Sequence, residues 1–299
     1  MMMRITTVVI LASVALAPAA RAQEEISTQH EASKEWNEAW IDRPLLLAPG
    51  AVQAGLGMDV SNLSVLDNNA TGETVSAAVD VGLSPRWQAG LALTVPVNPA
   101  SFGSAIANLQ MRLSDAANLR LDVGVARGGF IDNTSSDMTN DYMLGVSIPL
   151  KLKLSSNVAL ISGRTGPAGF ARPLAISVNG MGGIAVGATP FYMGESLFSV
   201  GINGNGVISM SANAPVGVMV ALSDRVAVDV HGGYRWMNGG NEMTGVSQNY
   251  HFLPFGGDVM VNLPGHIDVG VSADVAGPVS QNVDYLSTRQ FMGWLQARF

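Results

Sequence analysis

The stretch VQAGLGMDV, from Val52 to Val60, alternates apolar side chains with polar or small ones at every position. Its even-numbered positions are all apolar, whereas the odd-numbered positions carry Gln53, Asp59 and two glycines. Successive side chains of a β-strand point to opposite faces of the sheet, so this pattern predicts a strand with one apolar face. The pattern decides the fold class because it recurs along most of the chain.

Period-2 alternation returns in segment after segment, for example around Val75 to Leu83 and Val226 to Val230. We expect an all-β fold of about 14 strands, with 12 as the alternative number, since each segment suits a tilted strand that crosses a membrane in about 9 to 11 residues. The expected strands are 51–63, 73–83, 87–97, 104–113, 118–128, 141–154, 157–165, 180–192, 196–204, 215–222, 225–236, 250–262, 266–276 and 287–299.

The composition is that of a hydrophobic chain with few ways to bury its apolar surface. Of 299 residues, 47% are hydrophobic, 13% are charged and none is cysteine. The absence of cysteine excludes a disulfide framework and a thiolate metal site. After residue 22 no stretch is long and apolar enough for a spanning helix. Strands with one face toward lipid account for this composition better than the competing interpretation, a secreted soluble β-sandwich.

The amino-terminal residues 1–22 have the pattern of a secretory signal peptide. Arg4 precedes an apolar run, and small residues lead up to Ala22, after which we expect cleavage. Removing Arg4 and Arg21 from the 16 basic residues leaves 14 against 23 acidic residues, a net charge of −9. A chain this acidic is not expected to bind nucleic acid.

The connections between the expected strands alternate between short and long. Tight turns at Ser84 to Arg86, Ser114 to Ala117 and Ser223-Asp224 alternate with longer links such as Asn133 to Asn140 and Met237 to Asn249. An up-and-down barrel needs such alternation when one rim faces a confined compartment and the other faces outward. The same alternation of short and long connections places both termini on the short-turn side.

With these features the chain resembles the bacterial outer-membrane β-barrel proteins, a porin-like superfamily, over nearly all of its mature length. The signal, the strands, the connections and the last strand, Phe291 to Phe299, carry the resemblance. In that family a final strand with alternate apolar residues and a terminal Phe is an assembly signal, which implies such a role for Phe291, Leu295 and Phe299. Gly293 and Trp294 are less typical of it. The resemblance implies an outer-membrane location in a Gram-negative cell, with the lipid and the barrel assembly machinery as partners.

The expected organisation has three parts: the signal peptide at 1–22, an amino-terminal leader at 23–49, and the transmembrane barrel at 50–299. Trp36 and Trp40 lie four residues apart, so they share one face if the segment 26–42 is helical. A short helix that plugs the barrel mouth and a leader without packing partners both fit this segment.

Parity along the strands predicts which charged side chains line the lumen, because charges facing lipid are costly. The basic residues fall on strands four to six, and most acidic ones on strands one, two and eleven to thirteen, so we expect them on facing walls near the short turns. The predicted pore-lining residues are Arg112, Arg120, Asp122, Lys151, Lys153, Asp59, Asp80, Asp229, His231, Asp258, Asp268 and Asp274.

These features predict a porin-like channel for passive diffusion of small polar solutes. A structural or surface-interaction barrel with a closed lumen and a gated channel for hydrophobic compounds are the alternatives. We expect that the protein is not an enzyme. His231 and Asp229 share a face, but no hydrolase motif surrounds them or Ser211. We also expect no cofactor and no metal site.

Overall fold

The structure is a computed structural model that describes residues 39–65, 68–98, 103–128, 139–162, 176–179, 183–186, 198–202, 208–240, 247–275, 277, 279 and 288–299. The expected signal peptide at 1–22 and the leader up to residue 38, including Trp36, lie outside these residues. Apart from a short 3-10 helix, η1 (Trp40–Asp42), the regular structure in the described part is all β. Among the described residues no helix has the length and apolar character that a membrane crossing requires.

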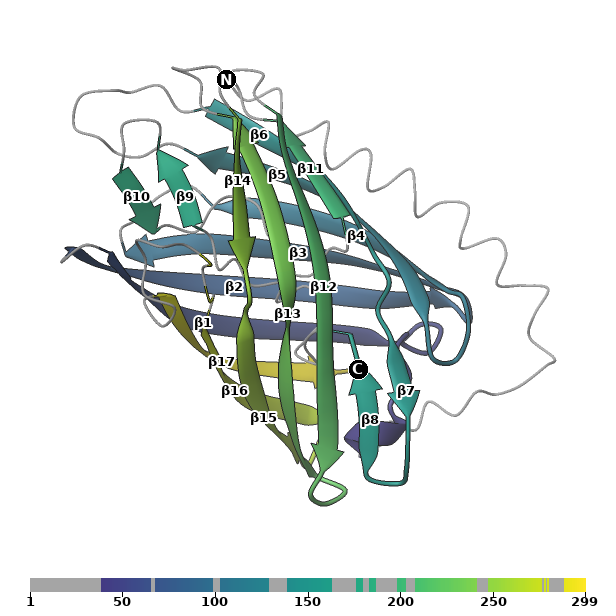
Figure 1. The fold of residues 1–299 in the computed structure, drawn as a ribbon. Coiled ribbons are helices and arrows are strands. Elements are labelled where there is room, and N and C mark those ends of the chain that lie inside the picture. The colour runs from purple at the N-terminus through teal and green to yellow at the C-terminus, as the bar shows by residue number, and fades with distance from the viewer. Residues whose placement is uncertain are drawn as a thin grey trace.

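The described residues form 17 strands, most of which are tilted around a common axis (Figure 1). They are β1 (Val52–Val65), β2 (Asn68–Ser84), β3 (Trp87–Asn98), β4 (Ser104–Arg112), β5 (Asn118–Gly128), β6 (Thr139–Ser147), β7 (Lys151–Lys153), β8 (Val158–Ile161), β9 (Ile176–Asn179), β10 (Gly183–Val186), β11 (Phe198–Ile202), β12 (Ile208–Ala221), β13 (Val226–Gly240), β14 (Ser247–Phe252), β15 (Phe255–Leu263), β16 (Ile267–Val275) and β17 (Thr288–Arg298).

Twelve strand positions close into an antiparallel barrel. The order runs β13, β15, β16, β17, β1, β2, β3, β4, β5, β6, β11 and β12, and the pairing of β12 with β13 completes the ring. The seam between the two chain ends is formed by β17 and β1, which pair from Gln53 with Arg298 to Leu63 with Thr288. The expected all-β up-and-down barrel is therefore confirmed, with 12 strands in the ring.

Two of the ring positions hold strands that are interrupted at a proline. β14 and β15 both pair with β13 and are separated by Leu253 and Pro254. β6 and β7 follow each other in the same way, with Pro149 in the interval between them. Proline has no N–H to donate to the ladder, which favours a break at these two places, although β3 and β12 continue through Pro96 and Pro215.

The expected number of 14 strands is too high by two, and the region after β7 explains why. β8 pairs with the half of β12 nearer the short turns and β11 pairs with the other half, so these two segments share one ring position (Figure 1). β9 and β10 pair only with each other within the described part of the chain, and β10 approaches β1 and β2. Strands of 4 or 5 residues, at about 3.3 Å per residue, are too short to cross about 30 Å of hydrocarbon alone.

In the described part of the barrel most apolar side chains lie on the outside and most inward side chains are polar or small, the reverse of a soluble protein. Leu56, Val123 and Val271 on the outer face are each more than half exposed, whereas Asp122 and Ser272 on the inner face are buried. The alternation seen in the sequence is thus the alternation between outward-facing and lumen-facing positions of the barrel wall. Further exposed apolar residues on the outer face are Met58, Leu91, Leu93, Val95, Leu121, Leu144, Val218, Val230, Val259, Phe291 and Leu295.

Short turns, the described amino-terminal segment and the carboxyl terminus lie at the same end of the barrel, which we call the short-turn end. The turns follow β2, β4, β7, β12 and β15. At the other end the strands run further than expected: β2 begins at Asn68 and β12 at Ile208, inside stretches that we predicted to be long connections. The strands there exceed the length needed to cross a membrane, so their far ends extend beyond the apolar belt.

Candidate functional site: the lumen and the segment that crosses its mouth

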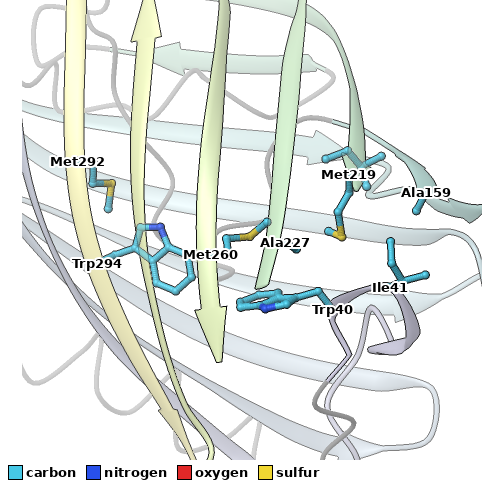
Figure 2. Close-up of a cluster of buried hydrophobic side chains, with 9 residues drawn as sticks. Trp40, Ile41, Ala159, Met219, Ala227, Met260, Met292 and Trp294 are labelled. Atoms are coloured by element: carbon cyan, nitrogen blue, oxygen red, sulfur yellow. The ribbon is translucent and has the colours of Figure 1, made fainter. Parts of the chain in front are cut away.

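The mouth segment, residues 39–50, lies inside the barrel at the short-turn end. Trp40 and Ile41 are each 3% exposed, whereas most other large apolar residues in the described part of the chain face outward. Figure 2 shows these two side chains among inward-pointing residues of the barrel wall. The apolar cluster around them consists of Ala159, Ile161, Met219, Ala227, Met260, Met292 and Trp294, from β8, β12, β13, β15 and β17.

Trp40 is held by two ring contacts. Its ring meets Trp294 edge to face, with centroids 6.3 Å apart and planes at 75°, and the Arg43 guanidinium lies 3.7 Å from the Trp40 centroid. Such an aromatic pair contributes about 0.5–1.5 kcal/mol beyond the area it buries. The Trp294 indole has room because it lies against Gly270, where a Cβ would overlap the ring.

Arg43 anchors the mouth segment to β16 through a bidentate ion pair with Asp268. The Arg43 Nη1–Asp268 Oδ2 distance is 2.8 Å and the Nη2–Oδ1 distance is 2.9 Å. Asp268 also accepts hydrogen bonds from Asn262 at 2.8 Å and Gln296 at 2.6 Å, and its side chain is fully buried. Arg43 supplies this buried carboxylate with a hydrogen-bonded positive charge, and Arg298 interacts with it electrostatically as well.

On another part of the wall, β7 holds the backbone of the same segment. Lys151 Nζ donates hydrogen bonds to the carbonyl oxygens of Trp40 and Arg43, and Lys153 pairs with Asp42. β7 lies five ring positions from β16 by the shorter way round, close to the largest possible separation of six. The segment therefore bridges nearly opposite walls of the mouth.

The rest of the segment follows β4, β3 and β2 on its way to the first strand. Gln110 donates to the Leu45 carbonyl at 3.0 Å, and Gln88 accepts from the Leu47 N–H at 2.8 Å. At Gly82 a Cβ would overlap the Ala48 carbonyl group, so only glycine allows the two backbones to come this close. The contacts from β16 and β7 to β2 show that the segment crosses the mouth.

The structure places the predicted acidic pore-lining residues on the inner face. His231 and Asp274 are half-buried there. The fully or nearly fully buried members of the set are Asp59, Asp80, Asp122, Asp229, Asp258 and Asp268.

The predicted basic residues differ more from one another in their surroundings. Arg120 is a buried neighbour of Asp122 on β5, with an Nε–Oδ1 distance of 2.8 Å. Arg112 lies 3.9 Å from Asp115 in the adjacent turn. Lys151 is half-buried beneath the mouth segment, and Lys153 is exposed at the short-turn end.

The structure brings four of these residues together that the sequence had placed only on the same wall. His231 Nδ1 lies 2.7 Å from Asp229 Oδ1 and 3.8 Å from Asp258 Oδ2, and its Nε2 lies 2.8 Å from Asp274 Oδ1. We call this group the histidine–aspartate cluster. It occupies the next two inward-facing rows beyond the row of Ala227, Met260 and Trp294, further from the short-turn end.

Three residues that hold the mouth segment, Arg43, Gln88 and Gln110, were not among those predicted from the sequence. Parity could have identified the two glutamines, because both occupy inward positions near the short turns and are buried. Arg43 precedes the first strand, so alternation carries no information about which way its side chain points.

The predicted assembly residues Phe291, Leu295 and Phe299 lie on the outer face, where they are 58%, 47% and 78% exposed. The terminal residue also closes the seam of the barrel: the Phe299 N–H donates to the Val52 carbonyl at 2.8 Å, and the Val52 N–H donates to the Phe299 carbonyl at 3.0 Å. Phe299 therefore combines a ring on the outer surface with a backbone that completes the ladder.

Solved structures of outer-membrane barrels share this architecture. The COG4313 outer membrane channel from Pseudomonas putida F1 aligns with a TM-score of 0.54 and 11% identity, over 85% of this chain and 97% of that one. At these identities the likeness concerns the fold alone. The closed antiparallel ring and its apolar outer face agree with it, and the chain thus has the fold of the outer-membrane β-barrel proteins.

Two further solved structures align less closely. The translocator domain of the autotransporter NalP from Neisseria meningitidis has a TM-score of 0.47 and 9% identity, over 96% of this chain and 98% of that one. The NanC porin has a TM-score of 0.41 and 10% identity, over 80% and 98% of the two chains. No family model and no curated protein matches the chain.

Proposed function

We propose that this protein is an outer-membrane channel for passive diffusion of small polar solutes, closed at its periplasmic mouth by residues 39–50. The observation that carries the proposal is the combination of a polar inner wall with a segment across one mouth. The segment is held by side-chain contacts with the wall, such as those of Arg43 and Lys151. Displacing residues 39–47 would leave the strand ladder of the barrel intact, whereas Gly50 at the end of the segment donates a backbone hydrogen bond to the Gly82 carbonyl of β2.

The size of the ring supports a channel. Twelve strands about 4.8 Å apart and tilted by about 40° give a backbone radius of roughly 12 Å. Eight strands make an interior that side chains just fill, so twelve leave space when the inward side chains are small. Many of them are small, and they are also polar or neutral: Gly72, Thr74, Ser76, Gly90, Ala92, Thr94, Gly124, Gly145 and Ser211.

The short-turn end is the periplasmic end in this proposal. Barrels of this class have short periplasmic turns and longer extracellular loops. The mouth segment precedes the first strand at that end, so closure would act from the periplasmic side.

Conductance of the full chain in a planar bilayer tests the proposal. The wild-type protein should be closed for most of the recording. Trp40→Ala should raise the fraction of time spent open several-fold, because it removes the side chain at the centre of the apolar cluster around Trp40 and Ile41. Trp87→Ala is the matched control, since Trp87 lies on the outer face and its loss should leave gating unchanged. A folded Trp40→Ala barrel without any conductance would instead support a structural barrel with a closed lumen.

A second candidate function, a gated channel for hydrophobic compounds, is favoured by one observation. The inward side chains around Trp40 form an apolar patch that includes Met219, Met260 and Trp294, and Trp40 packs against it in this structure (Figure 2). Once uncovered, such a patch offers a surface to an apolar solute. Block of the open Trp40→Ala channel by an apolar solute, compared with a polar solute of equal size, separates the two candidates.

A further inference from the structure

The two ring nitrogens of His231 face different carboxylates, and this division has chemical meaning. Nδ1 faces Asp229 at 2.7 Å and Asp258 at 3.8 Å, whereas Nε2 faces Asp274 at 2.8 Å. One ligand atom from each of Asp229, His231 and Asp258 lies within 4.8 Å of the other two. We propose that these three residues bind one divalent transition-metal cation in the lumen, with Asp274 as the residue that orients the histidine.

The positions of the three ligand atoms fit such an ion after a small adjustment. Zinc binds imidazole nitrogen and carboxylate oxygen at about 2.0–2.2 Å, so its ligand atoms are about 3–4 Å from one another. The Nδ1–Asp229 distance of 2.7 Å would lengthen when the ion replaces the proton between these atoms. The Nδ1–Asp258 distance of 3.8 Å already lies in this range.

Asp274 supplies the outer contact that a metal-binding histidine usually has. A ligating imidazole commonly donates its other N–H to a carboxylate, which fixes the tautomer and the ring orientation. The sheet register places His231, Gly256 and Asp274 in one row across β13, β15 and β16. A Cβ at Gly256 would overlap the Asp274 carboxylate, so glycine at this position lets the carboxylate reach across to the ring.

Buried polar atoms beside the histidine–aspartate cluster are a second, independent observation. Ser272 and Gln290 are 5% and 1% exposed, and the Ser272 Oγ and Gln290 Nε2 atoms have no hydrogen-bond partner within the described part of the chain. They are the cross-strand neighbours of Asp258 and Asp274 on the inward face. Buried polar atoms are normally satisfied, and a metal ion with its water ligands would satisfy atoms in these positions.

Charge and donor type indicate the class of ion. The cluster holds three carboxylates and one imidazole, and the side chains of Asp229 and Asp258 are fully buried. Positive charge stabilises carboxylates that are removed from water, and a divalent cation would add it among them. One nitrogen and several oxygen donors, in a chain without cysteine, suit Zn²⁺ or Mn²⁺ rather than an ion that prefers sulfur.

Calorimetric titration of the folded full chain with ZnCl₂, in detergent and without a histidine tag, tests the proposal. We expect one Zn²⁺ per chain, with the dissociation constant raised at least tenfold by His231→Gln and by Asp258→Asn. Asp274→Asn should raise it by about 10- to 100-fold, as loss of an orienting carboxylate does. Asp80→Asn, a buried lumen carboxylate on β2, should keep the wild-type value.

X-ray absorption of the Zn²⁺-loaded wild-type protein keeps the proposal testable if the variants do not fold. The expected spectrum shows one imidazole and otherwise oxygen donors. Absence of stoichiometric Zn²⁺ binding, unchanged affinity in folded His231→Gln, or a set of ligands without imidazole would each overturn the assignment. Because the readout is Zn²⁺ binding, a negative result does not bear on the proposed channel function. A negative conductance result likewise does not bear on the metal site.

Discussion

Arg43 and Asp268 form a bidentate ion pair inside the barrel, 225 residues apart in the sequence, with N–O distances of 2.8 and 2.9 Å. It joins the mouth segment to β16, and the Asp268 side chain is fully buried. A pair of this kind contributes less to stability than its geometry suggests, because both charges lose water. Breaking it on one side is costly, since the other charge remains buried, and this asymmetry makes the pair suitable as a latch.

Arg43→Gln should release the mouth segment. The change removes the guanidinium that donates two hydrogen bonds to the Asp268 carboxylate, and such a loss costs about 3–5 kcal/mol for a buried pair. The open fraction in single-channel recordings should rise, and the melting temperature should fall. The double variant Arg43→Gln with Asp268→Asn removes both charges, so it should recover part of the lost stability. Equal melting temperatures for the single and double variants would contradict a coupled latch.

Gly82→Leu should displace the same segment by a steric route. A Cβ at this position would overlap the Ala48 carbonyl group and lie 2.8 Å from the Leu47 carbonyl oxygen, and both groups belong to the backbone. We expect more frequent opening in conductance recordings, with the barrel still folded. Gly293→Leu is the control, because a Cβ there meets no atom within 4 Å. Identical gating in the two leucine variants would show that the contact at Gly82 does not hold the segment.

The sequence predicted the barrel because period-2 alternation reports directly on which side of the wall a residue faces. It overestimated the strand number by two: β8 and β11 each form a strand while sharing one ring position, and the described part of the predicted strand 180–192, β10, pairs with β9 outside the ring. Alternation shows that a segment is a strand and not where along its neighbour it pairs. For the histidine–aspartate cluster, the sequence predicted only that its members lie on the same wall. It could not predict the contact of His231 with Asp274, because that contact depends on the register across Gly256.

The orientation in the membrane is a prediction that surface labelling can check. If the short-turn end faces the periplasm, a cysteine at Ser156, in the turn after β7, should be inaccessible to a membrane-impermeant maleimide on intact cells. A cysteine at Gly239, near the far end of β13, should be labelled. The chain contains no cysteine of its own, so the background is low. The opposite labelling pattern would show that the short-turn end faces the cell exterior.

Phe299 should matter for assembly more than a lipid-facing ring alone would explain. Its side chain is 78% exposed on the outer face, and its backbone pairs with Val52 at the seam. Replacing Phe299 by Asp should lower the amount of folded, heat-modifiable protein in the outer membrane, because it puts a charge at the lipid boundary and removes the terminal aromatic. Phe299→Tyr keeps the ring and should assemble normally. Similar folded yields for Asp and Tyr would argue against the assembly role.

The charge selectivity of the opened channel should depend on facing walls. β5, which carries Arg120, lies six ring positions from β16 in either direction, and β7 lies five from it. Fixed charges in a narrow lumen act on a passing ion more strongly than in bulk water. In the Trp40→Ala background with a chelator present, neutralising Lys151 and Lys153 should shift the reversal potential toward cation preference. Neutralising Asp258 and Asp268 should shift it toward anion preference.

Both shifts should shrink in concentrated salt, because screening shortens the reach of fixed charges. The competing outcome is local neutralisation, for which the Arg120–Asp122 pair with its 2.8 Å Nε–Oδ1 distance is the example. If neighbouring charges cancel in this way across the lumen, little transverse field remains for an ion to sense. Reversal potentials measured across a salt gradient decide between the two: unchanged selectivity in both double variants, with conductance still open, would mean that local pairs and not facing walls set the potential in the lumen.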